Sequence, residues 1–567
     1  MDKRMFLAIS LSMLVMVAFY TLVPQPPVAP PKPKTGEAAA PAAPGAPATP
    51  VPSAPSAAAS APRLREIPAQ PSRTIALETP LYTATVDTRG GVLTSLKLKD
   101  YKEGKSTVDW GDVIPPLRRW IGKGVVDEKK LVDMVPPANG GALPLAFSAV
   151  GQDALTKAFQ DGVFAVEGEP ARLKSGDKQP ATLILTAKGP QGLTVRKLVS
   201  FHADSYAMDY EVQVINYGKA ALPIQAVNGF GEGPSLANLQ GQQGHQGPVY
   251  REGGKVRTKS PDDVKDGFLV KEAQWAGITS PFFLSAVVAQ TPIEAVSYTL
   301  LPAAKEGAPR SAHYAVRLAS VNLEAGKMVS SKFKLYLGPK STAAMEKFGH
   351  KLEDSLDLTL DVLAAPMLAM LRWFNSFAHN YGVAIILLTI VVRGLLFPLT
   401  YKGMVSMKRM QKLQPKMTAL RERFKGDKER MNREVMELYR RYKVNPLSGC
   451  LPILLQIPIF FALYSALMGA IELRHAPFML WINDLSQQDG LYVLPLLMGA
   501  SMFIQQKLTP SSLDPTQAKI MLWMPVIFTF FMLNFPAGLT LYWFTSNLLS
   551  IAQQLVINRV QVPEYAD

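Results

Sequence analysis

The chain of 567 residues contains a single cysteine, Cys450, and only six histidines. One cysteine excludes an internal disulfide and any cysteine-based metal site. The histidines show no metal-site spacing, and the sequence contains neither a Gly-x-Ser-x-Gly elbow nor a Walker loop. We therefore expect no metal, no cofactor and no enzymatic activity.

Acidic residues are missing from the apolar segments in the last third of the chain. Neither Asp nor Glu occurs in 367–399, 449–471, 491–506, 520–534 or 539–557. A proton-coupled transporter is expected to carry an acidic relay or an ion site within its spans. The absence of carboxylates from these segments argues against that class.

Arg393 lies in the apolar stretch Val383–Leu399, which is about long enough to cross a bilayer. An arginine in hydrocarbon costs roughly 3 kcal/mol or more, so it normally faces a partner charge, water or a ligand. Because the spans offer no carboxylate, we expect the acid that meets Arg393 to come from outside the protein. Helical spacing places Thr389 one turn earlier on the same face. The alternative is that Arg393 snorkels toward the cytoplasmic surface near Lys402, about 13 Å along the helix.

The sequence of the N-terminal part predicts a membrane anchor followed by an extended linker. Residues 1–23 contain an apolar run preceded by Lys3 and Arg4, which predicts a membrane anchor with a cytoplasmic N-terminus. A cleaved signal peptide is the alternative. Residues 24–75 are rich in proline and alanine, so we expect an extended linker.

The 48% of hydrophobic residues are concentrated late in the chain, which predicts a soluble domain joined to a membrane domain. Period-two alternation within 76–345 predicts an all-β sandwich on the far side of the membrane. Residues 351–374 form an amphipathic pattern expected to lie along the membrane surface, with Pro366 dividing it into two helices. With the anchor, five further stretches make a polytopic α-helical membrane protein of six spans, at 381–401, 449–471, 491–506, 520–534 and 539–557.

The net charge of +15 is concentrated in one loop. Residues 402–443 hold fourteen Lys or Arg against five acids, so this loop is expected in the cytoplasm. Because the charge lies beside the spans, topology explains it better than nucleic-acid binding, and DNA is not an expected partner. The loop around 472–490 has Arg474 as its only Lys or Arg and is expected outside.

Within 402–446, apolar residues recur at helical spacing and predict two amphipathic helices joined near Gly426. The two apolar faces are expected to pack on each other as a hairpin. A functional alternative is that its methionines bind varied apolar partners while its basic residues contact ribosomal RNA or anionic lipid. Pro415 predicts a kink in the first helix. The candidate residues of this hairpin are Met404, Met407, Met417, Lys408 and Arg409.

Three stretches resemble the YidC family of membrane protein insertases, in its Gram-negative form. They are YGVAIILLTIVVRGLLFPLT (381–400), NPLSGCLPILLQIPIFFALYSALMGAIELRHAPF (445–478) and FPAGLTLYWFTSN (535–547). The LYLGPK stretch (335–340) and the long domain before it resemble the same form. The resemblance implies a five-helix core with a hydrophilic groove that is open to the cytoplasm and to lipid and closed toward the periplasm.

The resemblance also assigns residues. It implies that Arg393 is the arginine of the groove and Thr389 its threonine, and that the substrate path is lined by Gln456, Phe460, Met502 and Trp543. Trp543 stands where some members have tyrosine, so an aromatic contact is expected to persist without the hydroxyl. The C-terminus lacks the basic extension of many relatives, which leaves the hairpin as the better candidate for ribosome contact.

We therefore expect a bacterial inner-membrane insertase with both termini in the cytoplasm. Its expected partners are nascent membrane proteins, the Sec translocon, the ribosome and lipids, and the resemblance adds help in folding. Two other classes remain open at this stage. A lone arginine is compatible with an anion channel, and the sandwich is compatible with a periplasmic glycan-binding protein or enzyme that has a passive membrane anchor.

Overall fold

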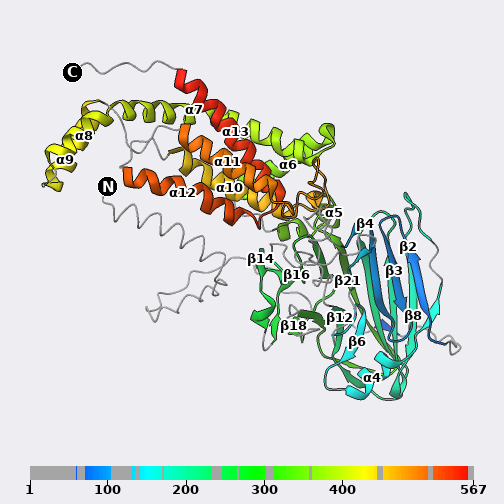
Figure 1. The fold of residues 1–567 in the computed structure, drawn as a ribbon. Coiled ribbons are helices and arrows are strands. Elements are labelled where there is room, and N and C mark those ends of the chain that lie inside the picture. Colours follow the sequence, from blue (N-terminus) through cyan, green and yellow to red (C-terminus); the bar gives the residue numbers. More distant parts are fainter. Residues whose placement is uncertain are drawn as a thin grey trace, which may run out of the picture. The chain divides into compact units, whose positions relative to one another are not determined.

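The computed structural model describes residues 59–60, 71–103, 130–135, 141–168, 172–231, 245–264, 267–301, 312–356, 361–424, 426–442, 451–508 and 515–559. The anchor expected at 1–23 and most of the expected linker lie outside these residues. The described part contains a β region followed by a helical region (Figure 1).

The largest sheet of the β region has ten strands, and each strand runs antiparallel to its neighbours. Its long central strand β21 (Lys327–Pro339) pairs with β10 (Ala207–Asn216) on one side and with β17 (Phe283–Ala289) on the other. The remaining strands of this sheet are β14 (Lys255–Thr258), β13 (Gly247–Glu252), β16 (Ala273–Thr279), β9 (Leu193–Phe201), β8 (Ala181–Lys188), β7 (Ala165–Glu167) and the short β1 (Ala59–Ser60).

Three smaller sheets complete the described β region. A five-stranded sheet has the order β15 (Phe268–Val270), β18 (Ala295–Leu300), β19 (Ala312–Arg317), β12 (Ala226–Gly231) and β6 (Ala146–Ala149). A four-stranded sheet contains β2 (Thr74–Glu78), β3 (Tyr82–Asp87), β4 (Val92–Lys102) and β5 (Leu131–Asp133). The last sheet pairs β11 (Leu222–Ile224) with β20 (Val321–Leu323).

Aromatic side chains join the ten-stranded and five-stranded sheets into one core. Tyr210 of β10 stacks on Phe333 of β21, and Phe230 of β12 meets both rings edge-on. Ser285 of β17 lies 2.9 Å from the hydroxyl of Tyr314 of β19, so even the buried polar atoms pair across the two layers. Two antiparallel sheets that share one core form a sandwich, as the alternating pattern predicts.

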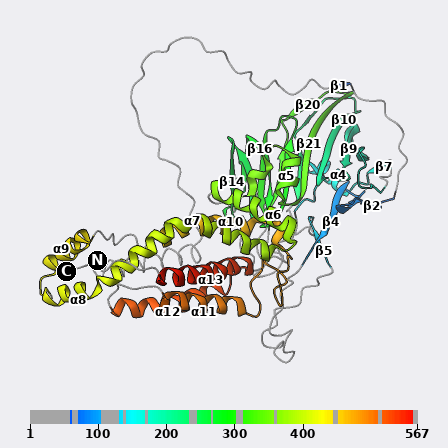
Figure 2. The same ribbon diagram turned by 90° about the horizontal axis from the view of Figure 1, so that it is seen from above.

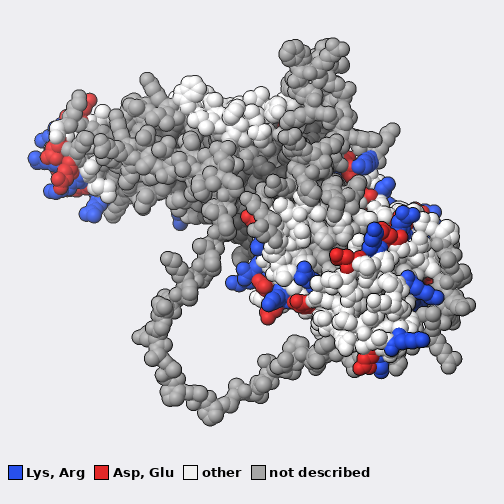
Figure 3. All heavy atoms as spheres, turned by 90° about the horizontal axis from the view of Figure 1, so that it is seen from below, with Lys and Arg blue, Asp and Glu red and all other residues white. Residues whose placement is uncertain are grey.

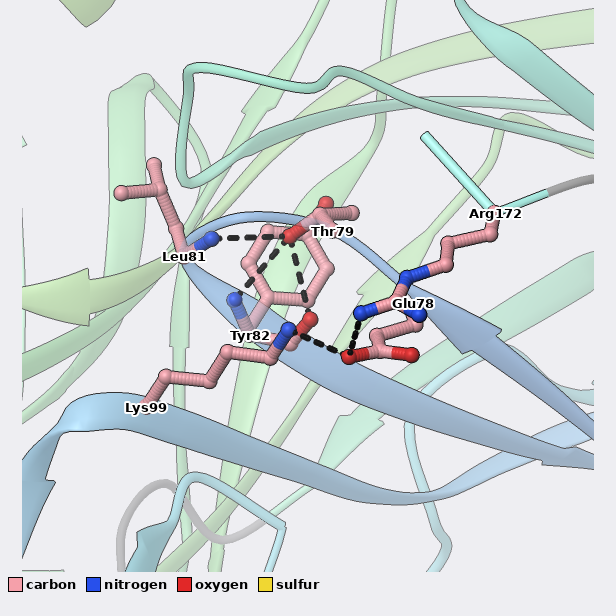
Figure 4. Close-up of polar contacts among 6 residues, drawn as sticks. All are labelled: Glu78, Thr79, Leu81, Tyr82, Lys99 and Arg172. Carbon is pink, nitrogen blue, oxygen red and sulfur yellow. Dashed lines mark hydrogen bonds and ion pairs between the residues drawn. The ribbon is translucent and has the colours of Figure 1, made fainter. Parts of the chain in front are cut away.

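Local sequence signals explain how the strands begin. In β3, buried and half-buried side chains alternate from Tyr82 onward, which is the period of a strand with one face in the core. The turn before it is held by Thr79, whose hydroxyl accepts from the backbone N–H groups of Leu81 and Tyr82 (Figure 4). The carboxylate of Glu78 beside it accepts from Lys99 at 2.8 Å.

One charged side chain lies fully inside the sandwich. The ammonium of Lys197 on β9 donates to the carbonyls of Gly90 and Leu145 at 2.7 Å and of Gly91 at 3.1 Å. Its three donors therefore match three acceptors, two from the Gly90–Gly91 turn and one from Leu145. Burial lowers the pKa of Lys197 to about 7.

Two short helices, α4 (Asp153–Asp161) and α5 (Thr342–Phe348), belong to the β region, and six helices of at least 16 residues follow it in the described chain. These six are α6 (Asp361–Ala378), α7 (Tyr381–Lys412), α10 (Leu451–Gly469), α11 (Val493–Leu508), α12 (Pro515–Met532) and α13 (Ala537–Arg559). The basic loop adds α8 (Gln414–Arg423) and α9 (Lys428–Arg441). Helix α13 packs against α7 and α11, and α11 packs against α12 (Figure 2).

Each of the five spans expected after the β region overlaps one helix. Among the described residues, only α7 is long and apolar enough to cross a membrane by length and composition. Shorter apolar helical segments occur at Val362–Ala378, Gln456–Gly469 and Leu522–Met532. The number of spans therefore remains a prediction.

The sequence predicts a helix break at Pro366 and a kink at Pro415, and the structure differs between the two positions. The expected break at Pro366 is wrong, because α6 continues through it and ends at Ala378. Pro415 does coincide with a break: α7 ends at Lys412, and α8 begins at Gln414 with the proline in its first turn. A proline is tolerated in the first helical turn because the N–H groups there have no acceptor within the helix.

Large apolar side chains are exposed mainly in the helical region. In the described β region only Val150, Val163 and Leu269 are exposed, whereas Leu395, Trp523, Phe530 and Val556 are each at least 60% exposed on the helices. On the face drawn in Figure 3, charged side chains gather over the α8–α9 end and over the β region. This distribution is typical of helices that face lipid beside parts that face water.

Candidate polar site among α7, α10 and α13

The half-buried side chain of Arg393 on α7 reaches α13. Its guanidinium donates to the hydroxyl of Ser546, with 2.9 Å between Nε and Oγ and a second bond from Nη2. Ser546 is 3% exposed. Within the described residues Arg393 forms no ion pair, so its charge is met by a neutral hydroxyl. The hydroxyl of Ser546 therefore accepts hydrogen bonds from Arg393 but does not neutralise its positive charge.

A second polar pair continues the site from α13 to α10. The side-chain amide of Gln456 donates to the hydroxyl of Tyr542, which lies one helical turn before Ser546. Tyr542 is buried, while Gln456 is half-buried. Arg393, Ser546, Tyr542 and Gln456 thus form a polar cluster shared by three helices, which we call the polar site.

An aromatic group lies beside the polar site. The ring of Trp543 on α13 contacts Phe460 on α10 edge-on, with 5.0 Å between centroids. It also contacts Phe528 on α12 at 4.7 Å. Trp543 and Phe460 are half-buried, so the structure brings together two residues that the resemblance assigns to the substrate path.

Two other predicted residues lie apart from these contacts. Thr389 is fully buried, and its hydroxyl donates to the carbonyl of Ile385 in its own helix at 2.6 Å. Met502 on α11 is half-buried against the helical core. Its neighbour Ser501 accepts from the side chain of Asn547 at 2.9 Å, which connects α11 with α13.

The loop between α10 and α11 covers one end of this helical core. Its backbone is joined to the start of α13: the carbonyl of Gln487 accepts from Ala537 N at 2.7 Å, and that of Leu485 accepts from Gly538 N at 2.9 Å. Buried Asp484 holds the loop through two bonds from Ser486. Burial raises the pKa of Asp484, although these bonds oppose the shift. The core is therefore capped at the end where α7, α11 and α13 begin.

The hairpin lies at the opposite end. On α7, Met404 and Met407 are half-buried and Arg409 is exposed, while Lys408 donates to the last carbonyls of α13, those of Ile557 and Asn558. A lysine at a helix C-terminus also complements the helix dipole. Lys408 thus connects the base of the hairpin to the last helix.

Helices α8 and α9 pack on each other as expected for a hairpin. Met417 of α8 is 3% exposed and accepts from the hydroxyl of Tyr439 of α9 at 3.3 Å. The ammonium of Lys416 donates to the hydroxyl of Tyr442 at 2.9 Å. Met417 therefore packs inside the hairpin. Contact with a partner would use the exposed side chains of the hairpin instead.

Neither Tyr542 nor Ser546 is among the site residues predicted from the sequence. The available signal was spacing, because Tyr542, Ser546 and Ser550 follow one another at intervals of four residues on α13. All three are buried. A polar stripe inside an apolar helix predicts a polar partner on the facing helix, which here is Arg393.

The fold and the site define a protein in which a large β domain is followed by a helical core that carries Arg393 within an apolar segment. Residues 373–564 match the family described as 60Kd inner membrane protein, and residues 123–370 match the YidC periplasmic domain.

Named relatives extend the match over the whole chain. A protein of Geotalea daltonii named membrane protein insertase YidC is 38% identical over 567 residues, covering 99% of each chain. The protein of that name in Geobacter metallireducens is 40% identical and covers 86% of this chain and 85% of its own. The chain therefore belongs to the YidC family of membrane protein insertases, as its resemblance to that family predicts. A crystal structure of an active YidC insertase covers 85% of this chain and 92% of its own, with 18% identity and a TM-score of 0.35.

Proposed function

We propose that this chain inserts nascent membrane proteins into the bacterial inner membrane and helps them fold, with the polar site receiving their polar segments. The carrying observation is that Arg393 is met by Ser546 and, among the described residues, by no carboxylate. Membership of the insertase family supports the same activity.

In the proposed mechanism, a short polar segment of the substrate enters the polar site from the cytoplasmic end. Arg393 and Gln456 donate hydrogen bonds that replace part of the water it loses. The adjacent apolar helix of the substrate slides into lipid along α10 and α12, past Phe460 and Phe528. Burial of that helix in lipid supplies the driving force, so nucleotide hydrolysis is not required of this chain.

The proposed topology has six spans, with both termini and the hairpin in the cytoplasm and the β region in the periplasm. Two features support it: the basic loop, and the concentration of exposed apolar side chains on the helices. In this topology α6 lies along the membrane surface. The Sec translocon and membrane lipids are proposed partners, and the ribosome is proposed to contact the hairpin.

The two other hypotheses, an anion channel and a periplasmic glycan-binding protein, have less support. An anion channel needs a continuous pore, whereas the loop between α10 and α11 is hydrogen-bonded to the start of α13 at one end of the core. Neither reading accounts for a match that covers 99% of an insertase.

Replacement of Arg393 tests the proposed role. We expect Arg393→Lys to retain insertion of a substrate with an acidic tail, Arg393→Ala to lower it, and Arg393→Glu to lower it most. A substrate whose tail acids are replaced by Asn or Gln is the matched control and is expected to respond less. Equal insertion by Arg393→Glu and the unchanged protein would contradict the electrostatic role.

The substrate path is tested by a photocrosslinker placed at Trp543 during translation of a small membrane protein. A second probe at Phe460 is preferable to one at Thr389, because Thr389 is fully buried. We expect adducts with the nascent chain at both positions. Absence of adducts at both would favour the channel or anchor readings.

A further inference from the structure

The turn at 478–482, between α10 and α11, presents two large apolar side chains to the outside. Leu480 is 81% exposed and Met479 is 52% exposed. Leu480 also has a φ of +55°, a backbone conformation that a branched residue rarely adopts. Leu480 therefore occupies a position whose backbone conformation glycine adopts at lower cost, and its side chain is exposed.

Hydrogen bonds and close packing fix the turn to the helical core. Within it, Phe478 N donates to the carbonyl of Ile482, and Ile482 N donates to that of Met479. The side-chain amide of Asn380, which caps α7, donates to the carbonyl of Phe478 at 2.9 Å. The ring of Phe478 packs so closely on Gly382 that a Cβ there would lie 2.0 Å from it. The exposed residues therefore project from a rigid base at the start of α7.

Other large apolar side chains lie on the segments next to the turn. Trp481 is half-buried against the helical core. Trp373 and Phe377, on the last turns of α6, are 63% and 54% exposed, and the chain passes from Phe377 to Asn380 at the base of the turn. Aromatic and aliphatic side chains gathered at one end of membrane helices are typical of the boundary between lipid and water.

We propose that Met479 and Leu480 form a tip that inserts among the acyl chains of the leaflet on the side of the β region. The tip lies at the end where α10 finishes and α7, α11 and α13 begin, opposite the basic hairpin. The neighbouring helix α11 has only 16 residues, or about 24 Å, against a hydrocarbon core of about 30 Å. A tip that reaches into lipid supplies apolar surface where this helix falls short.

Lipid fits the tip better than a protein partner does. Leu480 and Met479 are adjacent in a tight turn and form a point, whereas a protein interface requires a broad complementary surface. The described β region, which faces water in the proposed topology, exposes no comparable apolar pair. The tip rests on the proposed topology but not on substrate insertion, so each can fail without the other.

The test uses the single cysteine of the chain. In a Cys450→Ala background, Leu480→Cys carries a fluorescent probe, and the full chain is reconstituted without other proteins in vesicles whose lipids are brominated on their acyl chains. Asn483→Cys is the matched control, because Asn483 is an exposed polar residue three positions away in the same loop. We expect the probe at 480 to be quenched at least twofold more strongly than the probe at 483, and Met479→Cys to behave like Leu480→Cys.

Equal quenching at 480 and 483 would overturn the proposal. Repeating the measurement at tenfold lower protein density separates lipid from a second copy of the chain. Quenching that does not change with density supports lipid, whereas quenching at 480 that appears only at low density would mean that copies cover the tip, and the proposal would be wrong. Insertion is assayed separately with the unlabelled Leu480→Gly variant, whose glycine adopts the same φ without strain.

Discussion

Arg393 on α7 donates to the hydroxyl of Ser546, a residue 153 positions later in the chain. The pairing is chemically asymmetric, because a full charge meets a group that carries none. The hydroxyl satisfies part of the guanidinium in the resting protein, and a carboxylate from a substrate is a stronger partner for the same donors.

Removal of the Ser546 hydroxyl is expected to destabilise the helical core. Ser546→Ala leaves a half-buried guanidinium without a hydroxyl acceptor, which costs about 1–3 kcal/mol of unfolding free energy. Thermal unfolding in a fixed detergent measures the change. Ser546→Thr keeps the hydroxyl and is expected to lose less, so equal stability of the Ala and unchanged proteins would refute this role.

The contact between Phe460 and Trp543 is expected to be energetically coupled. Aromatic pairs contribute about 0.5–1.5 kcal/mol beyond their buried area. A double-mutant cycle with Phe460→Leu and Trp543→Leu measures this coupling from unfolding free energies. Trp543→Tyr retains a ring and should keep part of the coupling, whereas strictly additive effects of the two leucine changes would show that the rings do not interact.

Two glycines in the helical region should respond in opposite directions. A Cβ on Gly499 would lie 2.0 Å from the hydroxyl of Thr529, so Gly499→Ala should push α11 away from α12 and cost about 1–3 kcal/mol. A Cβ on Gly394 meets no atom within 4 Å. Gly394→Ala should therefore raise stability by about 0.5–1 kcal/mol through helix propensity. Unfolding measured in the same detergent compares the two, and a loss at both positions would mean that Gly394 is packed.

The buried lysine predicts a pH dependence of the β region. The folded pKa of Lys197, about 7, lies below its ordinary value of 10.5, so between these values the unfolded state binds more protons than the folded state. The unfolding free energy should therefore rise with pH across this window, by at most about 1.4 kcal/mol per pH unit from this group. Lys197→Met is expected to flatten the rise.

Chemical denaturation followed at several pH values measures that slope. Lys188→Met is the matched control, because Lys188 is exposed on β8 of the same sheet. A slope that is the same in the Lys197→Met and Lys188→Met proteins would show that the buried ammonium does not titrate in this range.

The sequence predicts the β sandwich and the hairpin well because both follow from periodic patterns of apolar residues. It also singles out Arg393 as a candidate, since the lack of acids in the apolar segments can be read directly from the sequence. The partner of Arg393 cannot be read in that way, because several Ser, Thr and Asn residues occur on α13 and only packing against α7 selects Ser546.

Thr389 illustrates a different limit. Helical spacing places it on the same face as Arg393, yet its hydroxyl bonds to Ile385 in its own helix. The long side chain of Arg393 extends from α7 to a polar group on α13. The short side chain of Thr389 keeps its hydroxyl close to the backbone of its own helix. Spacing gives the face of a residue but not how far its polar atoms extend.

Helix α7 continues through Pro398, four residues after Gly394. Proline has no backbone N–H, so the carbonyl of Gly394 cannot receive the usual helical bond from that position. This carbonyl belongs to the residue next to Arg393, at an exposed glycine. The helix therefore has, one residue from Arg393, a backbone carbonyl without its usual helical donor. In the proposed mechanism, an entering chain brings backbone N–H groups as well as side chains, and this carbonyl is an acceptor that such an N–H group can use whatever the side chains of that chain.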